Sequence, residues 1–513
     1  MTSDPEPGTA IGRATGPAPA VSPLAVAALV AAVVVPAAIG GLPIAHDDLF
    51  GHLLTGRWIA EHGRAPAADP FSFTLPGAPW VSHEWGFSLL VHGVWRAGGL
   101  WGLVGLSAAL AAALFATVAV TALRRAPPGS RAAAPLAAAL LVAAAWAVSP
   151  EIFLRAALAG AVCFALLAAG IPSFRRRRSL GRGAALAALV LVWANLHSGV
   201  VFGLALVGLS ALDAAVRTGR RAVRDAALAL ACLGASLVNP HGIEALLYPF
   251  RLAALLADPA SGFEAGHFAG GWRGREALLG VLVALTLAGL LVLARRGRRP
   301  LDGWEAAALV LFGAGSWMTS RVSVELAVLL VPVATGVGAA ILGERSATPR
   351  PRVVRAVAGA GLAVAVFLVG GTLAARPTGA VAPHFPSAAA DFLRAEGLRG
   401  RTFNHQNWGG YLAWQLGIPI FWDGRNDVFA PLVREVTTTP FAEVADRYGV
   451  EVLVLSPREV RQLAPELASG RWGLVHLDRR SAVFLSRRAY PEALDRLEVR
   501  PPRSRRGGVR PPV

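Results

Sequence analysis

The sequence predicts an α-helical polytopic membrane protein with a C-terminal extracytoplasmic α/β domain. Three observations predict this class. Apolar segments near 20 residues long recur through residues 24–374, arginines occupy alternate connections between them, and residues 375–490 lack such segments. Of the 513 residues, 54% are hydrophobic and 16% are charged, whereas about 25% charged is usual for soluble domains. The composition therefore favours a chain that lies mostly in a bilayer.

The membrane module is predicted from helix length. An apolar helix of about 20 residues crosses a hydrocarbon core about 30 Å thick. Residues 1–23 precede the first such segment and are expected to be a disordered cytoplasmic N-terminus. Eleven segments are expected to span the membrane, at residues 24–43, 100–122, 132–149, 152–171, 183–197, 199–216, 225–238, 277–294, 303–319, 322–342 and 355–374.

The orientation follows from the arginines. Short loops retained in the cytoplasm are enriched in basic residues, and the arginines cluster at 124–131, 175–178, 217–224, 295–299 and 345–355. Placing these clusters inside predicts a multi-pass protein of a bacterial cytoplasmic membrane, with loop 44–99 and the C-terminal domain outside. All eleven histidines then lie on the outer side. Either arginines fill the inner loops and leave other polar residue types for the outer loops, or the outer face carries an active or binding site.

Composition also excludes several chemistries. The chain has no lysine, so it cannot form a Walker-type phosphate loop or a lysine Schiff base. The two cysteines, Cys163 and Cys232, lie in apolar stretches and predict neither a disulfide framework nor a cysteine metal site. The net charge of +17 is explained by the inner-loop arginines, so no nucleic-acid partner is expected.

Residues 375–490 are predicted to form an α/β domain with some parallel strand pairing, because short β-prone runs alternate with helical patterns. Residues 491–513 are rich in arginine and proline and are expected to be disordered. The strands are expected at Ile418–Trp422, Val452–Leu455 and Ala482–Leu485, and the helices at Ser387–Glu396, Phe441–Tyr448 and Arg458–Leu467.

The first outer loop holds the strongest candidates for chemistry. Asp48 and His52 are four residues apart and would share one face of a helix over residues 49–62. A carboxylate beside an imidazole can take a proton, bind Mg²⁺ or Mn²⁺, or hold a pyrophosphate. Asp47 and Asp48 could instead only cap that helix. The same loop adds further candidates for donor-phosphate or substrate binding, namely Arg57, His83 and Glu84.

Other candidates lie at the predicted outer ends of the spanning segments. Asn195 and His197 interrupt two apolar segments, and His241 follows an Asn-Pro pair. Turn formation would account for the asparagines but not for the histidines. Arg155 and Arg321 lie away from the inner clusters. They either snorkel to the headgroups or bind an anionic lipid phosphate through the guanidinium fork.

Two polar and aromatic runs stand out in the C-terminal domain, each after a strand-like stretch. Loops after strand ends are common ligand sites in parallel sheets. The alternative is a pair of turns in which Gly409 and Gly424 take positive φ while the aromatic residues pack on the membrane module. The candidate binding residues are Trp408, Tyr411, Asp423, Arg425 and Asp427.

These motifs together resemble those of a known family. The pattern Asp48-x-x-x-His52-x-x-x-Gly56-Arg57-Trp58-Ile59, with Trp80-Val81-x-His83-Glu84-Trp85, looks like the first outer loop of a group of bacterial polytopic membrane proteins. That group resembles GT-C glycosyltransferases, which use polyprenyl-phosphate-linked sugars. The correspondence continues through Arg155, Asn195-Leu196-His197, Asn239-Pro240, Arg321, Trp408-Gly409-Gly410-Tyr411-Leu412 and Asp423-Gly424-Arg425.

The resemblance implies a GT-C-like membrane module with a catalytic acid in the first outer loop and a lipid-phosphate site between the helices. Asp47 and Asp48 occupy the place of that acid, but His46 stands where a further acid is expected, which leaves open which carboxylate is the base. The expected activity is transfer of a hexosyl or pentosyl group from a polyprenyl phosphate to an envelope glycan, lipid or protein. A transporter or flippase of a lipid-linked substrate and an envelope scaffold are the alternatives.

Overall fold

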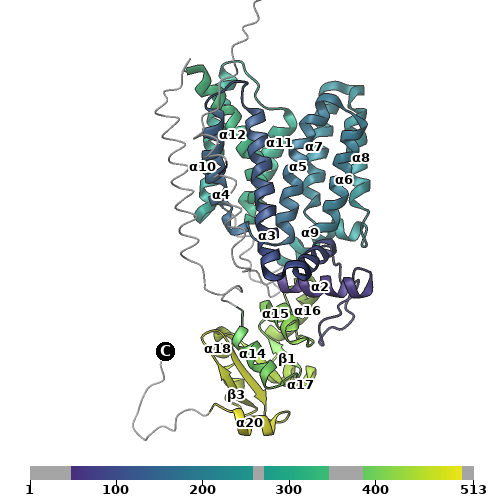
Figure 1. Ribbon diagram of the computed structural model, residues 1–513, viewed down its shortest axis with the longest axis vertical. Coiled ribbons are helices and arrows are strands. Elements are labelled where there is room, and N and C mark those ends of the chain that lie inside the picture. Colours follow the sequence, from purple (N-terminus) through teal and green to yellow (C-terminus); the bar gives the residue numbers. More distant parts are fainter. Residues whose placement is uncertain (1–29, 31–47, 258–270, 346–384, 500–513) are drawn as a thin grey trace, which may run out of the picture.

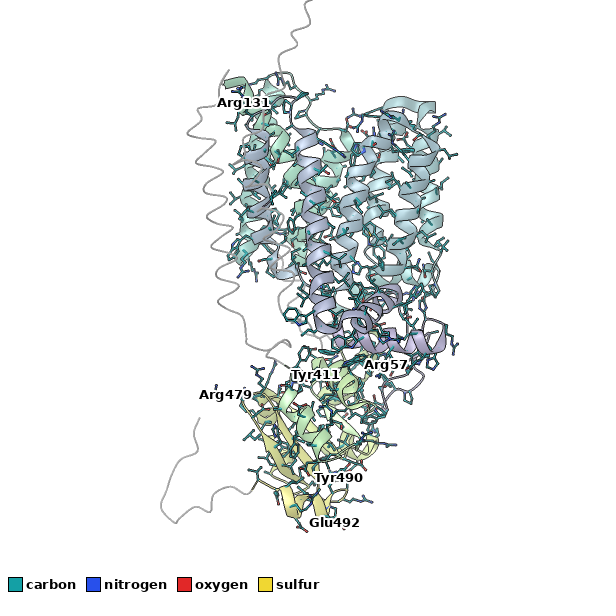
Figure 2. The ribbon with its side chains drawn as sticks, viewed as in Figure 1. Arg57, Arg131, Tyr411, Arg479, Tyr490 and Glu492 are labelled. Atoms are coloured by element: carbon teal, nitrogen blue, oxygen red, sulfur yellow. The ribbon has the colours of Figure 1, made fainter. Side chains whose placement is uncertain are left out.

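The computed structural model describes residue 30 and residues 48–257, 271–345 and 385–499. A bundle of long helices forms one part of the molecule, and a small sheet with short helices forms the other (Figure 1). Helix α2 (Asp48–His62) lies between them. The C-terminal region contacts the bundle at one end only, far from Arg131 at the opposite end (Figure 2).

The bundle confirms a helical membrane module. The predicted segments between residues 100 and 342 all coincide with helices, whereas segments 24–43 and 355–374 lie outside the described residues. Five described helices are long and apolar enough to cross a membrane, and α4 and α6 are shorter apolar helices. The bundle helices are α3 (Trp85–Arg125), α4 (Ala133–Ala147), α5 (Ala156–Arg177), α6 (Leu180–Leu196), α7 (Val200–Thr218), α8 (Val223–Ser236), α9 (Ile243–Ala257), α10 (Ala277–Arg295), α11 (Gly303–Met318) and α12 (Ser323–Arg345).

Two helical stretches of the bundle region were expected to be loops, and helix α20 (Pro491–Leu497) begins where the sequence predicted a disordered tail. Helix α9 lies within the predicted outer loop 239–276, and α3 starts at Trp85 rather than near residue 100. Gly99 has φ 55° and ψ −143°, so α3 is kinked there into two arms. The first arm buries Phe87 and Val91 and exposes Leu89. Because this arm mixes polar with apolar residues, a search for uniformly apolar segments does not find it.

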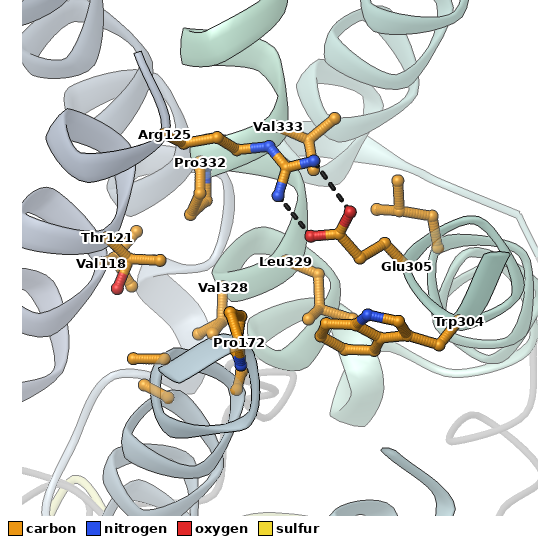
Figure 3. A pocket seen from close by; sticks show the side chains of 14 residues that line it. Val118, Thr121, Arg125, Pro172, Trp304, Glu305, Val328, Leu329, Pro332 and Val333 are labelled. Carbon is orange, nitrogen blue, oxygen red and sulfur yellow. Dashed lines mark hydrogen bonds and ion pairs between the residues drawn. The ribbon is translucent and has the colours of Figure 1, made fainter. Parts of the chain in front are cut away.

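The arginine clusters at 124–131, 175–178, 217–224 and 295–299 share the end of the bundle away from the C-terminal region, where acidic side chains neutralise several of them. The cluster at 345–355 lies almost entirely outside the described residues. Arg175 Nη2 lies 2.7 Å from Asp213 Oδ2, and Arg125 forms a two-pronged pair with Glu305 (Figure 3). A cavity of about 50 Å³ beside this pair is lined mostly by apolar side chains of α3, α5, α11 and α12 (Figure 3). The shared end agrees with the single-sided arginine placement in the sequence.

The C-terminal region is an α/β unit with a four-stranded sheet in the order β1-β2-β4-β3. Strands β1 and β2 are parallel, and the other pairs are antiparallel, so the expected parallel pairing is present. The strands are β1 (Thr402–Asn404), β2 (Val452–Leu455), β3 (Trp472–Leu477) and β4 (Ala482–Ser486), and the helices are α14 (Ser387–Ala395), α15 (Gly409–Leu416), α16 (Asn426–Thr438), α17 (Phe441–Tyr448), α18 (Pro457–Gln462), α19 (Ala464–Leu467) and α20 (Pro491–Leu497).

One predicted strand is wrong in form. Residues 418–422 make only isolated bridges through Ile420, which pairs with Thr402 and with Ser72 of the first loop. Thr74 Oγ1 also donates a hydrogen bond to the Phe421 carbonyl, at 2.5 Å. The run has the apolar and aromatic residues of a buried strand, which explains the prediction. One of its two bridges, however, joins Ser72, which is distant in sequence. The first loop and the C-terminal region therefore fold as one unit.

Helix α15 packs closely on α2. The ring of Phe50 meets those of Phe385 and Tyr411 edge-on, at 5.0 and 4.9 Å between centroids. A Cβ atom added at Gly410 would lie 2.8 Å from the Gly51 nitrogen, whereas a Cβ at Gly51 would meet nothing within 4 Å. This contact fixes α2 against the C-terminal region.

Gly410 has no room for a Cβ atom and Gly51 does, so alanine substitutions at these two positions form a matched pair. We expect Gly410→Ala to destabilise the protein by about 1–3 kcal/mol, because the methyl group overpacks a backbone contact. Gly51→Ala should be neutral or stabilising by up to about 1 kcal/mol, since alanine is the better helix former. Thermal unfolding in detergent measures both. Equal effects of the two substitutions would contradict the close α2–α15 contact.

Candidate functional site

Three imidazoles surround one carboxylate at the end of the bundle that faces the C-terminal region. Glu84 precedes α3 directly. Its carboxylate oxygens lie 3.6 Å from Nε2 of His52, 3.6 Å from Nε2 of His83 and 3.7 Å from Nε2 of His197. These residues come from α2, the first loop and the end of α6. We call them the Glu84 cluster.

Neighbouring groups fix which imidazole nitrogen carries a proton. His83 Nδ1 lies 3.2 Å from the Val81 carbonyl, which can only accept, so Nδ1 donates. Ser88 Oγ donates to the Glu84 carbonyl and therefore accepts from His52 Nδ1, at 2.9 Å. His197 differs, because its Nδ1 accepts from the Gly199 N–H. The proton of neutral His197 consequently faces Glu84, whereas His52 and His83 present a proton there only as imidazolium.

The electrostatics of the cluster separate its members. Burial opposes charge on Glu84, but the imidazoles of His83, His52 and His197 hold the pKa of its carboxyl well below the ordinary 4.5. Burial alone would lower the pKa of His83, yet the adjacent Glu84 carboxylate raises it above 6.5. Burial lowers the pKa of His197 to about 4 despite the nearby Glu84. The cluster at neutral pH thus combines an anionic Glu84 with a neutral His197.

Tyr248 of α9 covers His83 and connects it to the C-terminal region. The two rings stack with centroids 3.7 Å apart, and the Tyr248 hydroxyl is hydrogen-bonded to Asp427 in the first turn of α16. Burial raises the pKa of Asp427, although His83 and the Tyr248 hydroxyl oppose this. Asp427, a predicted binding residue, therefore lies beside the cluster.

Asp48 begins α2 and is exposed. Its Oδ1 would lie 3.2 Å from a Cβ at Gly424, so the predicted catalytic acid lies against the Asp423–Asp427 loop of the C-terminal region. Asp47 is outside the described residues. Among the residues that the structure covers, no group of three or more His, Cys, Asp or Glu side chains is arranged to hold a metal ion.

Arg155 and Arg321 lie on the bundle side of the cluster. Both guanidinium groups act electrostatically on His197. Arg155 precedes α5 and pairs with Glu151 at 2.9 Å, while the exposed Arg321 lies in the turn before α12. The structure thus brings both predicted phosphate-binding arginines near the Glu84 cluster.

Other predicted residues have structural partners. Asn195 accepts a hydrogen bond from Trp85 Nε1 and donates to the carbonyls of Leu191 and Val238. His241 Nε2 lies 2.9 Å from Ser82 Oγ in the first loop. Both side chains support the loops around the cluster.

Arg425 joins the first loop to the C-terminal region. Its Nε donates to Asp423 at 2.8 Å, and its Nη1 forms an ion pair with the fully buried Asp69 carboxylate at 2.7 Å. The guanidinium also lies over the rings of Trp80 and Phe429, at 4.6 and 5.3 Å. This network leaves Arg425 and Asp423 engaged with protein groups.

The remaining candidates contact other parts of the protein. The Arg57 guanidinium lies over the Trp414 ring at 5.0 Å, and Tyr411 packs on Phe50. Trp408 is buried in the α2–α15 interface core. Gly409 and Gly424 do not have positive φ. Instead, a Cβ at Gly409 would lie 2.1 Å from the Trp422 carbonyl oxygen, so close backbone approach explains that glycine.

Sequence reasoning missed two residues. They are Tyr248 of α9 and Glu325 of α12. For Glu325 a signal exists, because an acid within an apolar segment often marks a functional site. Glu84 was predicted to bind substrate, but its central place among three histidines depends on the packing of α2, α3 and α6.

The helical bundle with its kinked α3 and the appended α/β unit has a GT-C-like fold, as comparison with solved structures shows. Similar solved structures include the oligosaccharyltransferase AglB from Archaeoglobus fulgidus in complex with an inhibitory peptide and a dolichol-phosphate, with TM-score 0.60, 11% identity, and coverage of 88% of this chain and 72% of that chain. The apo oligosaccharyltransferase of the same organism has TM-score 0.57, 12% identity, and coverage of 88% and 73%.

A third solved structure is covered over nearly its whole length. ArnT from Cupriavidus metallidurans, bound to undecaprenyl phosphate, has TM-score 0.53, 17% identity, and coverage of 90% of this chain and 97% of that chain. No protein-family model and no curated protein matches the sequence. At these identities the likeness shows the fold.

Proposed function

We propose that this protein is a membrane glycosyltransferase that moves a hexosyl or pentosyl group from a polyprenyl-phosphate donor to an acceptor at the outer face of the cytoplasmic membrane. One observation carries the proposal. Asp48, the Glu84 cluster and the two arginines Arg155 and Arg321 converge where the bundle meets the C-terminal region. An exposed carboxylate near several candidate phosphate-binding groups suits transfer from a lipid phosphate.

The known ligands of the structural neighbours support the choice of donor. Dolichol-phosphate is bound to AglB and undecaprenyl phosphate to ArnT. A polyprenyl-phosphate sugar is an activated donor and requires no nucleotide site, in keeping with a chain that has no lysine for a Walker-type loop. The proposed partners are accordingly the bilayer, the lipid-linked sugar and an envelope glycan, lipid or protein acceptor.

The reaction forms one bond and breaks one. Asp48 or Asp47 takes the proton of the acceptor hydroxyl, whose oxygen bonds to the anomeric carbon of the sugar. The bond between that carbon and the phosphate oxygen breaks, and polyprenyl phosphate leaves with the electron pair. Arg155 and Arg321 stabilise the charge that develops on the phosphate. Glu84 orients the three histidines, of which His83 supplies a positive charge.

The test compares cells lacking the gene with cells complemented by wild type or by the Asp47→Asn, Asp48→Asn double variant. Mass spectrometry of polyprenyl-linked sugars and envelope glycans is the readout. We expect a lipid-linked sugar to accumulate, and one glycan residue to be lost, in both the null and the double variant. A normal profile with the double variant would limit the aspartates to helix capping and favour the transporter or scaffold alternatives.

A further inference from the structure

Two buried polar atoms behind the Glu84 cluster lack a hydrogen-bond partner among the described residues. Glu325, in the first turn of α12, is 8% exposed, and its Oε2 is unpartnered. The second atom is Nε of Arg155, a donor. Buried polar groups are nearly always hydrogen-bonded, so unsatisfied ones call for an explanation.

An internal ion pair does not account for Glu325. Arg155 already pairs with Glu151 through Nη2, at 2.9 Å, so its charge is balanced without Glu325. Glu325 nevertheless lies within electrostatic reach of Arg155. Helices α5 and α12 pack together, and Arg155 and Glu325 lie at the same end of them, Arg155 before α5 and Glu325 in the first turn of α12. The two unsatisfied atoms have opposite hydrogen-bonding character, because Arg155 Nε donates and the Glu325 carboxylate oxygen accepts.

These atoms extend the candidate site into the bundle. His197 contacts Glu84 on one side and is influenced by the Arg155 charge on the other. His197 also lies against α5, because a Cβ atom added at Gly160 would lie 2.8 Å from its Nδ1. Polar groups therefore extend from Glu84 through His197 toward the end of α5 and α12 that carries Arg155 and Glu325. A ligand that reached that end would need an acceptor for Arg155 and a donor for Glu325. A phosphate oxygen and a hydroxyl of the attached sugar provide that combination.

We infer that Arg155 and Glu325 form a subsite for the phosphate-linked sugar of the donor, in which Arg155 donates to the phosphate and Glu325 accepts a hydrogen bond from a sugar hydroxyl. The inference rests on the proposed function and assigns to it a neutral hexose or pentose with a free hydroxyl near the phosphate. Glu325 is thereby a residue that determines donor specificity.

The test measures binding to the full-length protein in detergent. The ligands are undecaprenyl phosphate alone and undecaprenyl phosphate carrying one glucose or one arabinose. We expect the wild type to bind one of the glycosylated lipids more tightly than the bare lipid. Glu325→Leu should weaken that binding by about 10- to 100-fold, the range for a hydrogen bond to a charged group, and change binding of bare undecaprenyl phosphate less than about twofold. Glu325→Gln, which retains a carbonyl acceptor, should keep part of the affinity.

Thr335→Val is the matched control, because it removes a buried hydroxyl of the same helix that bonds only within α12. It should leave both affinities unchanged. Ligand-free Glu325→Leu should unfold at the wild-type temperature or higher, since an unsatisfied carboxyl is removed.

A lower unfolding temperature of Glu325→Leu, or equal losses for bare and glycosylated lipid, would overturn the inference by assigning Glu325 a structural or phosphate role. Wild-type binding of the bare lipid without any gain from either sugar would overturn it too. Failure of the wild type to bind any of the three lipids would contradict the proposed function itself.

Discussion

Replacing Glu84 by Gln is expected to reduce sugar transfer by roughly 10²-fold or more, and to move the alkaline limb of the pH–rate profile to lower pH. The Glu84 carboxylate raises the pKa of His83 against the opposing effect of burial. Without it, burial dominates and His83 loses its proton at a lower pH. The rate is measured against pH with the lipid-linked sugar found by the cell experiment.

The stability of the same variant has a defined pH window. The lowered pKa of Glu84 contributes stability above its ordinary value of 4.5, and this is lost as pH falls through the folded-state pKa. The raised pKa of His83 contributes stability that is fully present below 6.5 and is lost as pH rises through the folded-state value. The wild-type advantage over Glu84→Gln should therefore be largest between about pH 5 and 6.5.

Thermal unfolding at pH 5.5 and 8.5 separates this result from a general loss of structure. The control is Glu61→Gln, an exposed acid near the end of α2, which should change neither the rate profile nor the pH dependence of unfolding. A pH-independent difference between wild type and Glu84→Gln would refute the charge coupling of Glu84 and His83.

The second large effect is expected for Arg425→Met. This change leaves Asp69 and Asp423 buried without their cation, and removing one partner from a buried ion pair costs about 3–5 kcal/mol. Asp69 is in the first loop and Arg425 is in the C-terminal region. The loss of stability should therefore be greatest where these two parts meet. We expect a lower unfolding temperature and faster proteolysis near that junction.

Arg447→Met is the matched control, since its pair with Glu435 involves an Arg447 side chain that is 56% exposed and such pairs contribute about 0–1 kcal/mol. Adding Asp69→Asn and Asp423→Asn to Arg425→Met should recover part of the stability by removing the unpaired charges. A destabilisation by Arg425→Met no larger than that by Arg447→Met would show that the junction does not depend on this cation.

The parts of the fold that follow from local pattern were predictable. Uniformly apolar segments became bundle helices, and Val452–Leu455 and Phe441–Tyr448 have the predicted bounds. The first arm of α3 was not predicted, because it mixes polar and apolar residues and the direction of the helix changes at Gly99. Residues Ile418–Trp422 were predicted to be a strand from their β-propensity. Propensity alone cannot show that Ile420 makes only isolated bridges, one of them with the distant Ser72.

The candidate site was predictable as a list of residues but not as an arrangement. Asp48 and His52 were related correctly to the same helix, since spacing along one helix is local information. The meeting of His52, His83 and His197 around Glu84 depends on three separate elements. Arg57 and Arg425 were also predicted to bind a ligand. In the structure they contact Trp414 and Asp69, and these contacts arise from tertiary packing that the sequence does not show.

The junction between the first loop and the C-terminal region has a consequence for biosynthesis. Thr74 and Phe421, which share a hydrogen bond, are 347 residues apart. At about 5–20 residues per second, a ribosome needs roughly 20–70 s to cover that distance. The loop that carries Asp48 therefore remains without its C-terminal partner while nearly all of the remaining helices are synthesised. The arrangement of this loop against the C-terminal region is thus completed only near the end of synthesis.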